Sequence, residues 1–303
     1  MTDLSGRQHR LESGSYRATV SSVGASLREL TFDGRNLVVP FEADDVRPSF
    51  RGATLAPWPN RVVDGKYSFV GMDYQLSLTE PSRHHALHGL AGWLDFAAVE
   101  ESSDRLVLGA TVEAQAGYPF RLELRVEFRL DESGLRWSVS ALNTGSLAAP
   151  FGTGPHPYLV AGDGRVDGWT LELPAESVLT VTEDRLIPLG LETVEGGEFD
   201  FRSSRVIADT FIDHAFTGLR RDADGVASVR LLSAAGTGVG MTWGDDCPWV
   251  QVHTADLADP AISRIGLAVE PMTCPPDAFN SGTDLLVIEP GESASAGWSI
   301  HAI

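Results

Sequence analysis

The chain has 303 residues, with 42 Asp plus Glu against 23 Lys plus Arg, so its formal net charge is −19 with histidine neutral. This balance argues against nucleic acid as a partner and against attachment to an anionic membrane, because both need a basic surface. Lys66 is the only lysine, which makes Schiff-base chemistry a poor first hypothesis. A hydrophobic fraction of 43% with 21% charged residues is typical of a folded, soluble domain.

The chain is expected to form a single domain over residues 1–303. All-β domains often extend to about 200–250 residues as one unit, and the sequence contains no linker, internal repeat or low-complexity tract. The two cysteines, Cys247 and Cys274, are too few for a disulfide framework or a zinc cage, so reduced thiols and a cytoplasmic location are expected. We predict no secretory signal and no membrane span, because no apolar run approaches roughly 18 residues.

Alternation of apolar and polar residues dominates the sequence and predicts strands. In chain order, residues 67–70 and 73–78 read as a hairpin around Gly71-Met72. Residues 120–130 and 135–139 read as a second hairpin, because a turn-like Asp131-Glu132-Ser133-Gly134 separates them. Further strands are predicted at residues 106–112, 169–173, 226–232, 249–253 and 285–288.

Long stretches with helical periodicity are absent, and only short helical pieces are expected. The 31 glycines and 17 prolines are spread through the chain, as expected for many turns between short strands. The fold class predicted from this pattern is all-β, with one large antiparallel β-sandwich.

Two segments in the first third of the chain carry polar groups out of step with the alternation. In residues 57–61, two prolines precede Asn60 and Arg61, whose donors suit hydroxyl groups or an oxyanion. The alternative for Arg61 is a surface ion pair. In residues 84–90, three histidines raise the option of a metal site, but no Asp, Glu or Cys completes a familiar spacing. His88 before Gly89 indicates a loop that presents a polar side chain.

Three later segments have the same character. His156 stands between two prolines, which restrict its backbone, and it is either a structural turn residue or a group held in one orientation. Asp213 lies among apolar residues and is either a turn cap or a hydrogen-bond acceptor for a ligand. Glu270 ends an apolar run, where burial would raise its pKa toward that of a useful base; the alternative is a hydrogen-bonded structural glutamate.

The order of these segments resembles that of the aldose 1-epimerase (galactose mutarotase) family over residues 52–297. Leu90 and Leu159 stand where many members have Gly and Phe; neither change removes a catalytic group, and both concern the sugar preference. The amino-acid sequence at residues 56–61 and 270–276 is similar to that of a bacterial subgroup, whose members are often described only as epimerase-like. The shared landmarks are Asn60-Arg61, Leu87-His88-Gly89, His156-Pro157-Tyr158, Asp213-His214-Ala215-Phe216, Glu270, residues 276–280 and Pro290-Gly291-Glu292.

The resemblance implies a large antiparallel β-sandwich that interconverts the α and β anomers of a free aldose, with no cofactor and no metal. It implies that Glu270 is the general base that takes the proton from the C1 hydroxyl. His156 is implied to be the general acid that protonates the ring oxygen. An imidazole and a carboxylate supply both functions near neutral pH.

The same resemblance implies substrate-binding roles for other residues. His88 and Arg61 are expected to hold and polarise the sugar, Asp213 to accept hydrogen bonds from ring hydroxyls, and Asn60 to support Arg61. Trp58 and Trp93 are candidates for contact with the apolar face of the ring, or else belong to the core. The expected partner is a small monosaccharide, and the expected assembly is a monomer or a homodimer. Residues 1–50 carry no predicted site residue.

Three other functions remain open from the sequence. A hexose-6-phosphate 1-epimerase needs basic residues at the phosphate, for which Arg47, Arg51 and Arg83 are possible donors. The chain could also be a non-catalytic domain that binds or senses carbohydrate. A glycosidase that uses Asp213 and Glu270 as its two carboxylates is the third alternative.

Overall fold

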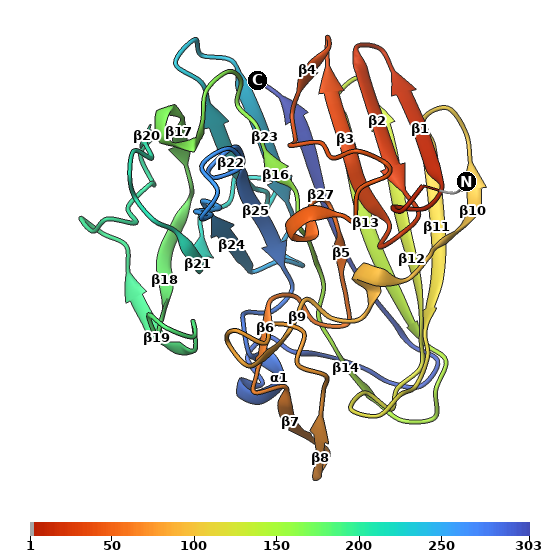
Figure 1. Ribbon diagram of the computed structural model, residues 1–303. Coiled ribbons are helices and arrows are strands. Elements are labelled where there is room, and N and C mark those ends of the chain that lie inside the picture. Colours follow the sequence, from red (N-terminus) through yellow and green to blue (C-terminus); the bar gives the residue numbers. More distant parts are fainter. Residues whose placement is uncertain (1–2) are drawn as a thin grey trace.

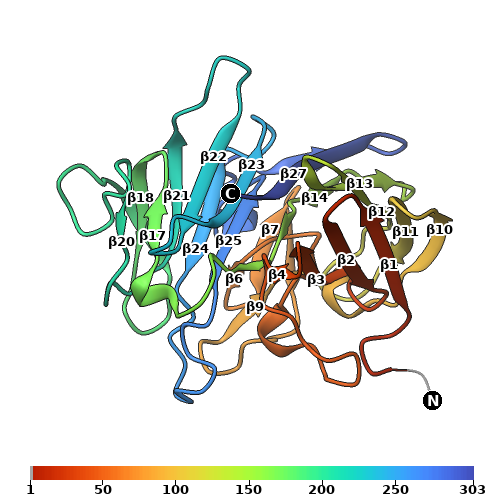
Figure 2. The same cartoon turned by 90° about the horizontal axis from the view of Figure 1, so that it is seen from above.

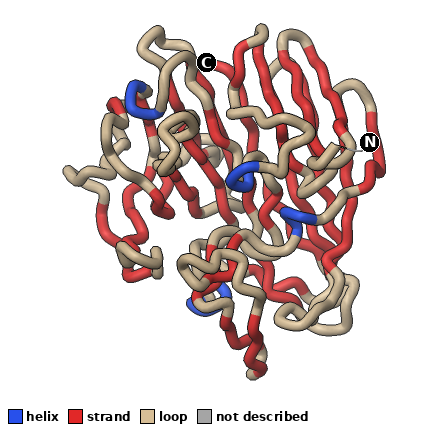
Figure 3. The backbone as a smooth tube through the Cα atoms, viewed as in Figure 1, coloured by secondary structure: helices blue, strands red, loops and turns tan. Residues whose placement is uncertain are grey.

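Strands make up most of the regular structure of this protein. The computed structural model describes residues 3–303 of the chain, and Figure 3 shows how few helical turns accompany the strands. Within residues 3–303 no helix has the length and apolar character of a membrane-spanning segment. The helical pieces are α1 (Ala278–Ser281) and 3-10 turns at Pro48–Phe50, Ala91–Trp93 and Val166–Gly168.

Three sheets form the body of the molecule (Figure 1), and all their strand pairings are antiparallel. The first contains β1 (Gln8–Ser13), β2 (Tyr16–Ser21), β3 (Ser26–Phe32) and β4 (Arg35–Asn36) in that order. The second has nine strands, in the order β10 (Ala97–Glu101), β11 (Arg105–Val112), β12 (Leu122–Asp131), β13 (Gly134–Asn143), β27 (Ser293–Ala302), β23 (Gly238–Trp243), β22 (Ala227–Leu232), β17 (Thr170–Glu172) and β20 (Arg205–Val206). The third has six, in the order β16 (Tyr158–Leu159), β25 (Leu267–Met272), β24 (Trp249–His253), β21 (Asp213–Leu219), β18 (Ala175–Val181) and β19 (Pro188–Thr193).

Short two-stranded pairs accompany these sheets, mostly in the lower half of the view in Figure 1. The pairs are β5 (Thr54–Leu55) with β15 (Gly154–Pro155), β6 (Arg61–Val63) with β9 (His85–Leu87), β7 (Lys66–Phe69) with β8 (Met72–Gln75), and β14 (Ala149–Phe151) with β26 (Leu286–Ile288).

The nine-stranded sheet provides one layer of two adjoining sandwiches. In Figure 1 the four-stranded sheet lies in front of β11, β12 and β13, and the view from above in Figure 2 shows β24 and β25 beside β22 and β23. One continuous apolar core fills both spaces: it includes Leu11 of the four-stranded sheet, Val126 and Met241 of the nine-stranded sheet, and Val250 of the six-stranded sheet. The predicted all-β sandwich is confirmed.

The alternation in the sequence corresponds to burial in the structure. Along β12, the apolar residues Leu124, Val126 and Phe128 are buried, while the intervening charged residues face outward. The first predicted hairpin is formed by β7 and β8, but its turn is at Val70-Gly71, one residue before the predicted position. Both turn residues have positive φ, 49° for Val70 and 75° for Gly71, which is the backbone that a tight hairpin needs.

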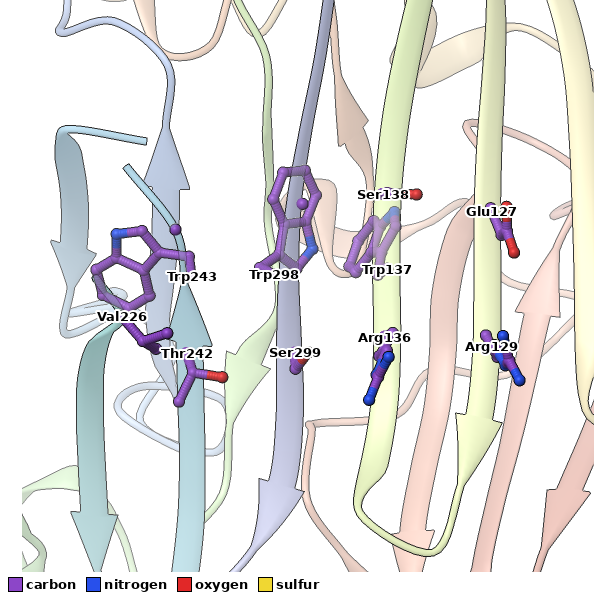
Figure 4. Close-up of a pocket in the computed structure, with 12 residues that line it drawn as sticks. Glu127, Arg129, Arg136, Trp137, Ser138, Val226, Thr242, Trp243, Trp298 and Ser299 are labelled. Carbon is purple, nitrogen blue, oxygen red and sulfur yellow. The ribbon is translucent and has the colours of Figure 1, made fainter. Parts of the chain in front are cut away.

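The outward face of the nine-stranded sheet has a shallow hollow of about 460 Å³. Figure 4 shows it with Glu127, Arg129 and Arg136 on neighbouring strands. These three charged side chains are exposed or half-buried, so the hollow has no buried charged residue in its lining.

The core between the sheets predicts a large effect for one aromatic residue. Phe128 is fully buried, with its ring centroid 5.1 Å from that of Trp137. We expect Phe128→Ala to lower the free energy of unfolding by about 3–5 kcal/mol. Val99→Ala, on the exposed edge strand β10, should change it by less than about 0.5 kcal/mol. Urea unfolding of the two variants and the wild type tests this, and equal losses would contradict the assignment of Phe128 to the core.

Candidate active site

The six-stranded sheet presents a row of polar side chains on one face. Along β24, Val250 and Val252 point into the main core, so Gln251 and His253 point to the opposite face. Gln251 pairs with Glu270 of β25, and His253 pairs with Asp213 of β21. Because paired residues share a face, three neighbouring strands place two carboxylates, an amide and an imidazole together.

This face borders a cavity of about 340 Å³, here called the site cavity. Loops from distant parts of the chain close it. Its lining consists of Ser49, Phe50, Asn60, Arg61, Glu80, Arg83, Leu87, His88, His156, Tyr158, Phe211, Asp213, Gln251, His253, Asp256, Leu257 and Glu270. Most of the residues predicted from the sequence as site residues therefore lie around one space.

Glu270 and His156 form a buried carboxylate–imidazole pair in the site cavity. Their side chains are only 2% and 6% exposed, and Oε1 of Glu270 lies 3.5 Å from Nε2 of His156. Burial and the nearby charge of Asp213 raise the pKa of Glu270 well above its ordinary value, against the opposing effect of Arg61. Burial and the neighbouring His253 lower the pKa of His156 to about 3. Burial therefore favours the neutral form of both groups.

The backbone around His156 is held on both sides. The N–H of Gly52 donates to the carbonyl of His156 at 2.8 Å, and the N–H of His156 donates to the carbonyl of Ala53 at 3.0 Å. The flanking prolines, Pro155 and Pro157, restrict the remaining torsions. These constraints fix the backbone position from which the imidazole projects, as expected for a group that transfers a proton at one position.

His88 is held by the loop that precedes β6. Its N–H donates to the carbonyl of Asn60 at 2.8 Å, and its ring stands at 83° to that of His156, with 4.9 Å between centroids. Phe50 packs on the His88 ring with a centroid distance of 4.8 Å. Burial, followed by the nearby His156 and Arg61, lowers the pKa of His88 well below its ordinary value, which keeps this imidazole neutral at physiological pH.

Arg61 lies at the start of β6 within an ion-pair network. Its Nε and Nη2 donate to the two carboxylate oxygens of Glu80 at 2.8 and 3.0 Å, and its Nη2 is 4.0 Å from Oδ2 of Asp213. Burial opposes the charge of Arg61, but the hydrogen bonds to Glu80 and the charge of Asp213 outweigh it and raise its pKa. Asn60 accepts the backbone N–H of Arg61 at 2.9 Å with its own Oδ1.

Asp213 is a stable carboxylate at the wall of the cavity. Its Oδ1 accepts a hydrogen bond from Nε2 of Gln251 at 2.7 Å, and Oδ2 lies 3.9 Å from Nδ1 of His253. Burial would raise the pKa of Asp213, but the opposing charges of His253 and Arg61 lower it overall. Asp213 thus suits the acceptance of hydrogen bonds better than the donation of a proton.

Two predicted aromatic contacts need correction. Trp58 is buried in the core, where its Nε1 donates to the carbonyl of Ala86 and its ring packs on Phe279, so it does not reach the site cavity. Trp93 is 54% exposed and lies behind Phe50, with 5.8 Å between ring centroids. Phe50, Tyr158 and Phe211 are the aromatic residues that line the cavity, and Phe50 lies beside both histidines.

The lining residues that were missed in the sequence include Phe50, Glu80, Gln251 and His253. The alternation in residues 249–253 was a usable signal for two of them, because Gln251 and His253 are the polar members of a strand whose other face is Val250 and Val252. Phe50 gave no such signal; its backbone has φ 55°, and only the folded chain places it against His88.

The structure locates the histidines of residues 84–88 separately. His84 is exposed, whereas His85 is buried, with its Nε2 2.8 Å from the carbonyl oxygen of Arg185. Among residues 3–303, one group of three potential metal ligands lies together: His88, His156 and Glu270, whose ligand atoms are within 4.8 Å of one another.

Comparison with known proteins identifies relatives of the whole chain. The sequence profile of the family described as aldose 1-epimerase matches residues 7–301. The protein YihR of Escherichia coli, described as uncharacterized, is 38% identical over 298 residues, which is 98% of this chain and 94% of that protein. An aldose 1-epimerase of Escherichia coli is 30% identical over 195 residues, 58% of this chain and 55% of that enzyme.

Solved structures share the fold. A GalM/aldose epimerase homologue from C. elegans has a TM-score of 0.86 at 19% identity, with 98% of both chains covered. A galactose 1-epimerase from Lactobacillus acidophilus has a TM-score of 0.81 at 21% identity, with 97% of this chain and 93% of that chain covered.

The close approach of Gly89 to the backbone of residue 56 predicts that substitution of Gly89 lowers the free energy of unfolding. Gly89 has φ 72°, and a Cβ at this position would lie 2.1 Å from the carbonyl oxygen of Ala56. Gly71 has φ 75° in an open turn with nothing within 4 Å, and so supplies a matched control. Gly71→Ala should cost about 1 kcal/mol of unfolding free energy. Gly89→Ala should cost about 1–3 kcal/mol more, because the backbone must shift. Chemical unfolding measures both, and equal losses would exclude the clash.

The raised pKa of Glu270 predicts how stability depends on pH. Above the ordinary value of 4.5 the unfolded chain loses this proton while the folded chain keeps it. The wild type should therefore lose stability relative to Glu270→Gln as pH rises from 4.5 to the folded pKa, by up to about 1.4 kcal/mol per pH unit. Below 4.5 the difference should be constant. Urea unfolding of both proteins at a series of pH values tests this, and a pH-independent difference would show that the folded carboxyl titrates normally.

Proposed function

This chain belongs to the aldose 1-epimerase family, and from that premise we propose that it interconverts the α and β anomers of a free aldose. The observation that carries the proposal is the buried pair of Glu270 and His156, 3.5 Å apart at the wall of a polar cavity. Mutarotation needs one base and one acid that act on two oxygens of the same acetal carbon, and this pair supplies one of each.

The proposed reaction moves two protons. Glu270 takes the proton of the C1 hydroxyl as the C1–O bond to the ring oxygen breaks, and His156 gives a proton to that ring oxygen. The C1 oxygen becomes a carbonyl, and the end of the open chain rotates about the C1–C2 bond. Return of both protons closes the ring on the other face of C1 and restores the two side chains.

The electrostatics of the empty cavity fit this cycle. Over the reaction the pair carries one shared proton, which begins on His156 with the closed sugar and ends on Glu270 with the open-chain sugar. The raised pKa of Glu270 and the lowered pKa of His156 favour the form in which Glu270 holds the proton. Hydrogen bonds from the closed sugar to the carboxylate must therefore stabilise the ionised pair, so that binding and ionisation are coupled.

The remaining lining residues suit the recognition of a monosaccharide. Arg61 and neutral His88 offer donors to the sugar oxygens, while Asp213 and Gln251 offer acceptors; the Oε1 of Gln251 is buried without a hydrogen-bond partner among the described residues. Phe50 supplies an apolar surface in the same cavity. Two free, buried cysteines support a cytoplasmic location as part of this proposal.

The hexose-6-phosphate alternative has weaker support. Arg47 donates to the carbonyl of Gly92 and to Oγ of Ser26 beneath Trp93, and it does not line the cavity. Arg51 lies behind Tyr158, with its guanidinium 6.0 Å from that ring centroid. Only Arg83 of the three predicted donors borders the cavity, and its Nη1 already pairs with Glu80 at 2.9 Å.

Two substitutions test the proposed roles. We expect Glu270→Gln and His156→Ala each to lower kcat by at least about 100-fold, because each removes one proton-transfer group. Polarimetry on freshly dissolved α-glucose and α-galactose measures the approach to anomeric equilibrium. Excess chelator should not lower the wild-type rate.

The controls separate this function from its alternatives. His84→Ala removes an exposed histidine outside the cavity and should retain the wild-type rate. Wild-type rates in both site variants would refute the assigned roles. No acceleration by a folded wild type, together with sugar binding in a thermal-shift assay, would favour a binding domain, and release of reducing sugar from a glycoside would favour a glycosidase.

A further inference from the structure

Three buried side chains of the site cavity have the composition of a metal-ligand set. His88 follows β9, His156 lies between β15 and β16, and Glu270 lies on β25, yet one ligand atom of each is within 4.8 Å of the other two. We propose that these side chains bind one late first-row transition-metal ion, such as Zn²⁺, and that this ion and the sugar exclude each other.

One separation between ligand atoms already matches that of a tetrahedral site. Zn–N and Zn–O distances of about 2.0–2.2 Å place neighbouring ligand atoms about 3.4 Å apart. Nε2 of His156 and Oε1 of Glu270 are already 3.5 Å apart. The backbone contacts of His88 to Asn60, and of His156 to Gly52 and Ala53, hold the two imidazoles in place. Rotation about the side-chain bonds of Glu270 can adjust the remaining distances.

The donors and the local charge select the class of ion. Two imidazoles and one carboxylate suit Zn²⁺, Co²⁺ and Ni²⁺, whereas Mg²⁺ and Ca²⁺ prefer oxygen ligands. Besides Glu270, the cavity lining contains the carboxylates of Glu80, Asp213 and Asp256 and the guanidinium groups of Arg61 and Arg83. Negative groups thus outnumber positive ones in this set, and a cation is attracted.

The surroundings favour an exchangeable ion over a resident cofactor. Nδ1 of His88 and Nδ1 of His156 have no hydrogen-bond partner among the described residues. Metal-bound histidines usually donate from the second ring nitrogen, and loss of such a partner weakens metal binding by about 10–100-fold. The ion would occupy the two groups that we propose to move protons. It would therefore act as a competitive inhibitor, a consequence that rests on the proposed function.

A zinc titration of the chelator-treated protein tests the site directly. Calorimetry with ZnCl₂ should show one ion per chain, and Co²⁺ should give the visible absorption of a four-coordinate complex. Glu270→Gln and His156→Gln should each bind Zn²⁺ at least about 10-fold more weakly. His84→Ala, which removes an exposed histidine near the same loop, should bind as the wild type does. Magnesium chloride should give no binding signal.

Competition tests the second half of the proposal. Galactose at a concentration that protects the protein in a thermal-shift assay should weaken Zn²⁺ binding, and Zn²⁺ should raise KM without a change in kcat. Absence of Zn²⁺ binding by folded wild type, or full binding by both site variants, would overturn the metal site. Binding that leaves mutarotation unaffected would overturn the exclusion. The titration contains no sugar, so it reports on the metal site even when mutarotation fails.

Discussion

The burial of one carboxylate beside one imidazole is the constraint around which this fold is arranged. Placing Glu270 and His156 out of water costs free energy for whichever of them is charged. Burial drives both groups toward their neutral forms, which raises the pKa of Glu270 and lowers the pKa of His156. The same burial makes the pair responsive to a ligand, because any hydrogen bond to the carboxylate acts in a medium where water does not compete.

Hydrogen bonds between segments far apart in the sequence hold the loops around this pair in position. The loop before β6 is tied to the loop after β9 through the Asn60–His88 backbone bond, and to α1 through the bond from Asp277 N to the Arg61 carbonyl at 2.7 Å. Asp277 also accepts the N–H of Val63 at 2.9 Å through its side chain. The landmark at residues 276–280 thus supports Arg61 from behind, and its contribution to the site is one of position.

The proposed aldose and the proposed transition-metal ion make related demands on one cavity. A sugar needs groups that accept and donate protons at neighbouring oxygens, while a metal ion needs the same groups with free lone pairs. His156 and Glu270 satisfy both requirements because they are neutral or paired and point at one position. Arg61, held by Glu80, adds the positive charge that favours sugar oxygens and opposes a cation.

The sequence alone determined the all-β fold, because period-two alternation records which side of each strand faces the core. It also identified the segments that carry Arg61, His88, His156, Asp213 and Glu270, since polar groups out of step with apolar alternation are costly unless they are used. The aromatic contacts were decided only by the tertiary structure. Whether Trp58 or Phe50 reaches the cavity depends on packing between distant segments, and the local sequence pattern carries no information about that packing. The proposed metal-ligand set also depends on the tertiary structure. The adjacent histidines His84 and His85 diverge, whereas residues 88, 156 and 270 come together from three distant parts of the chain.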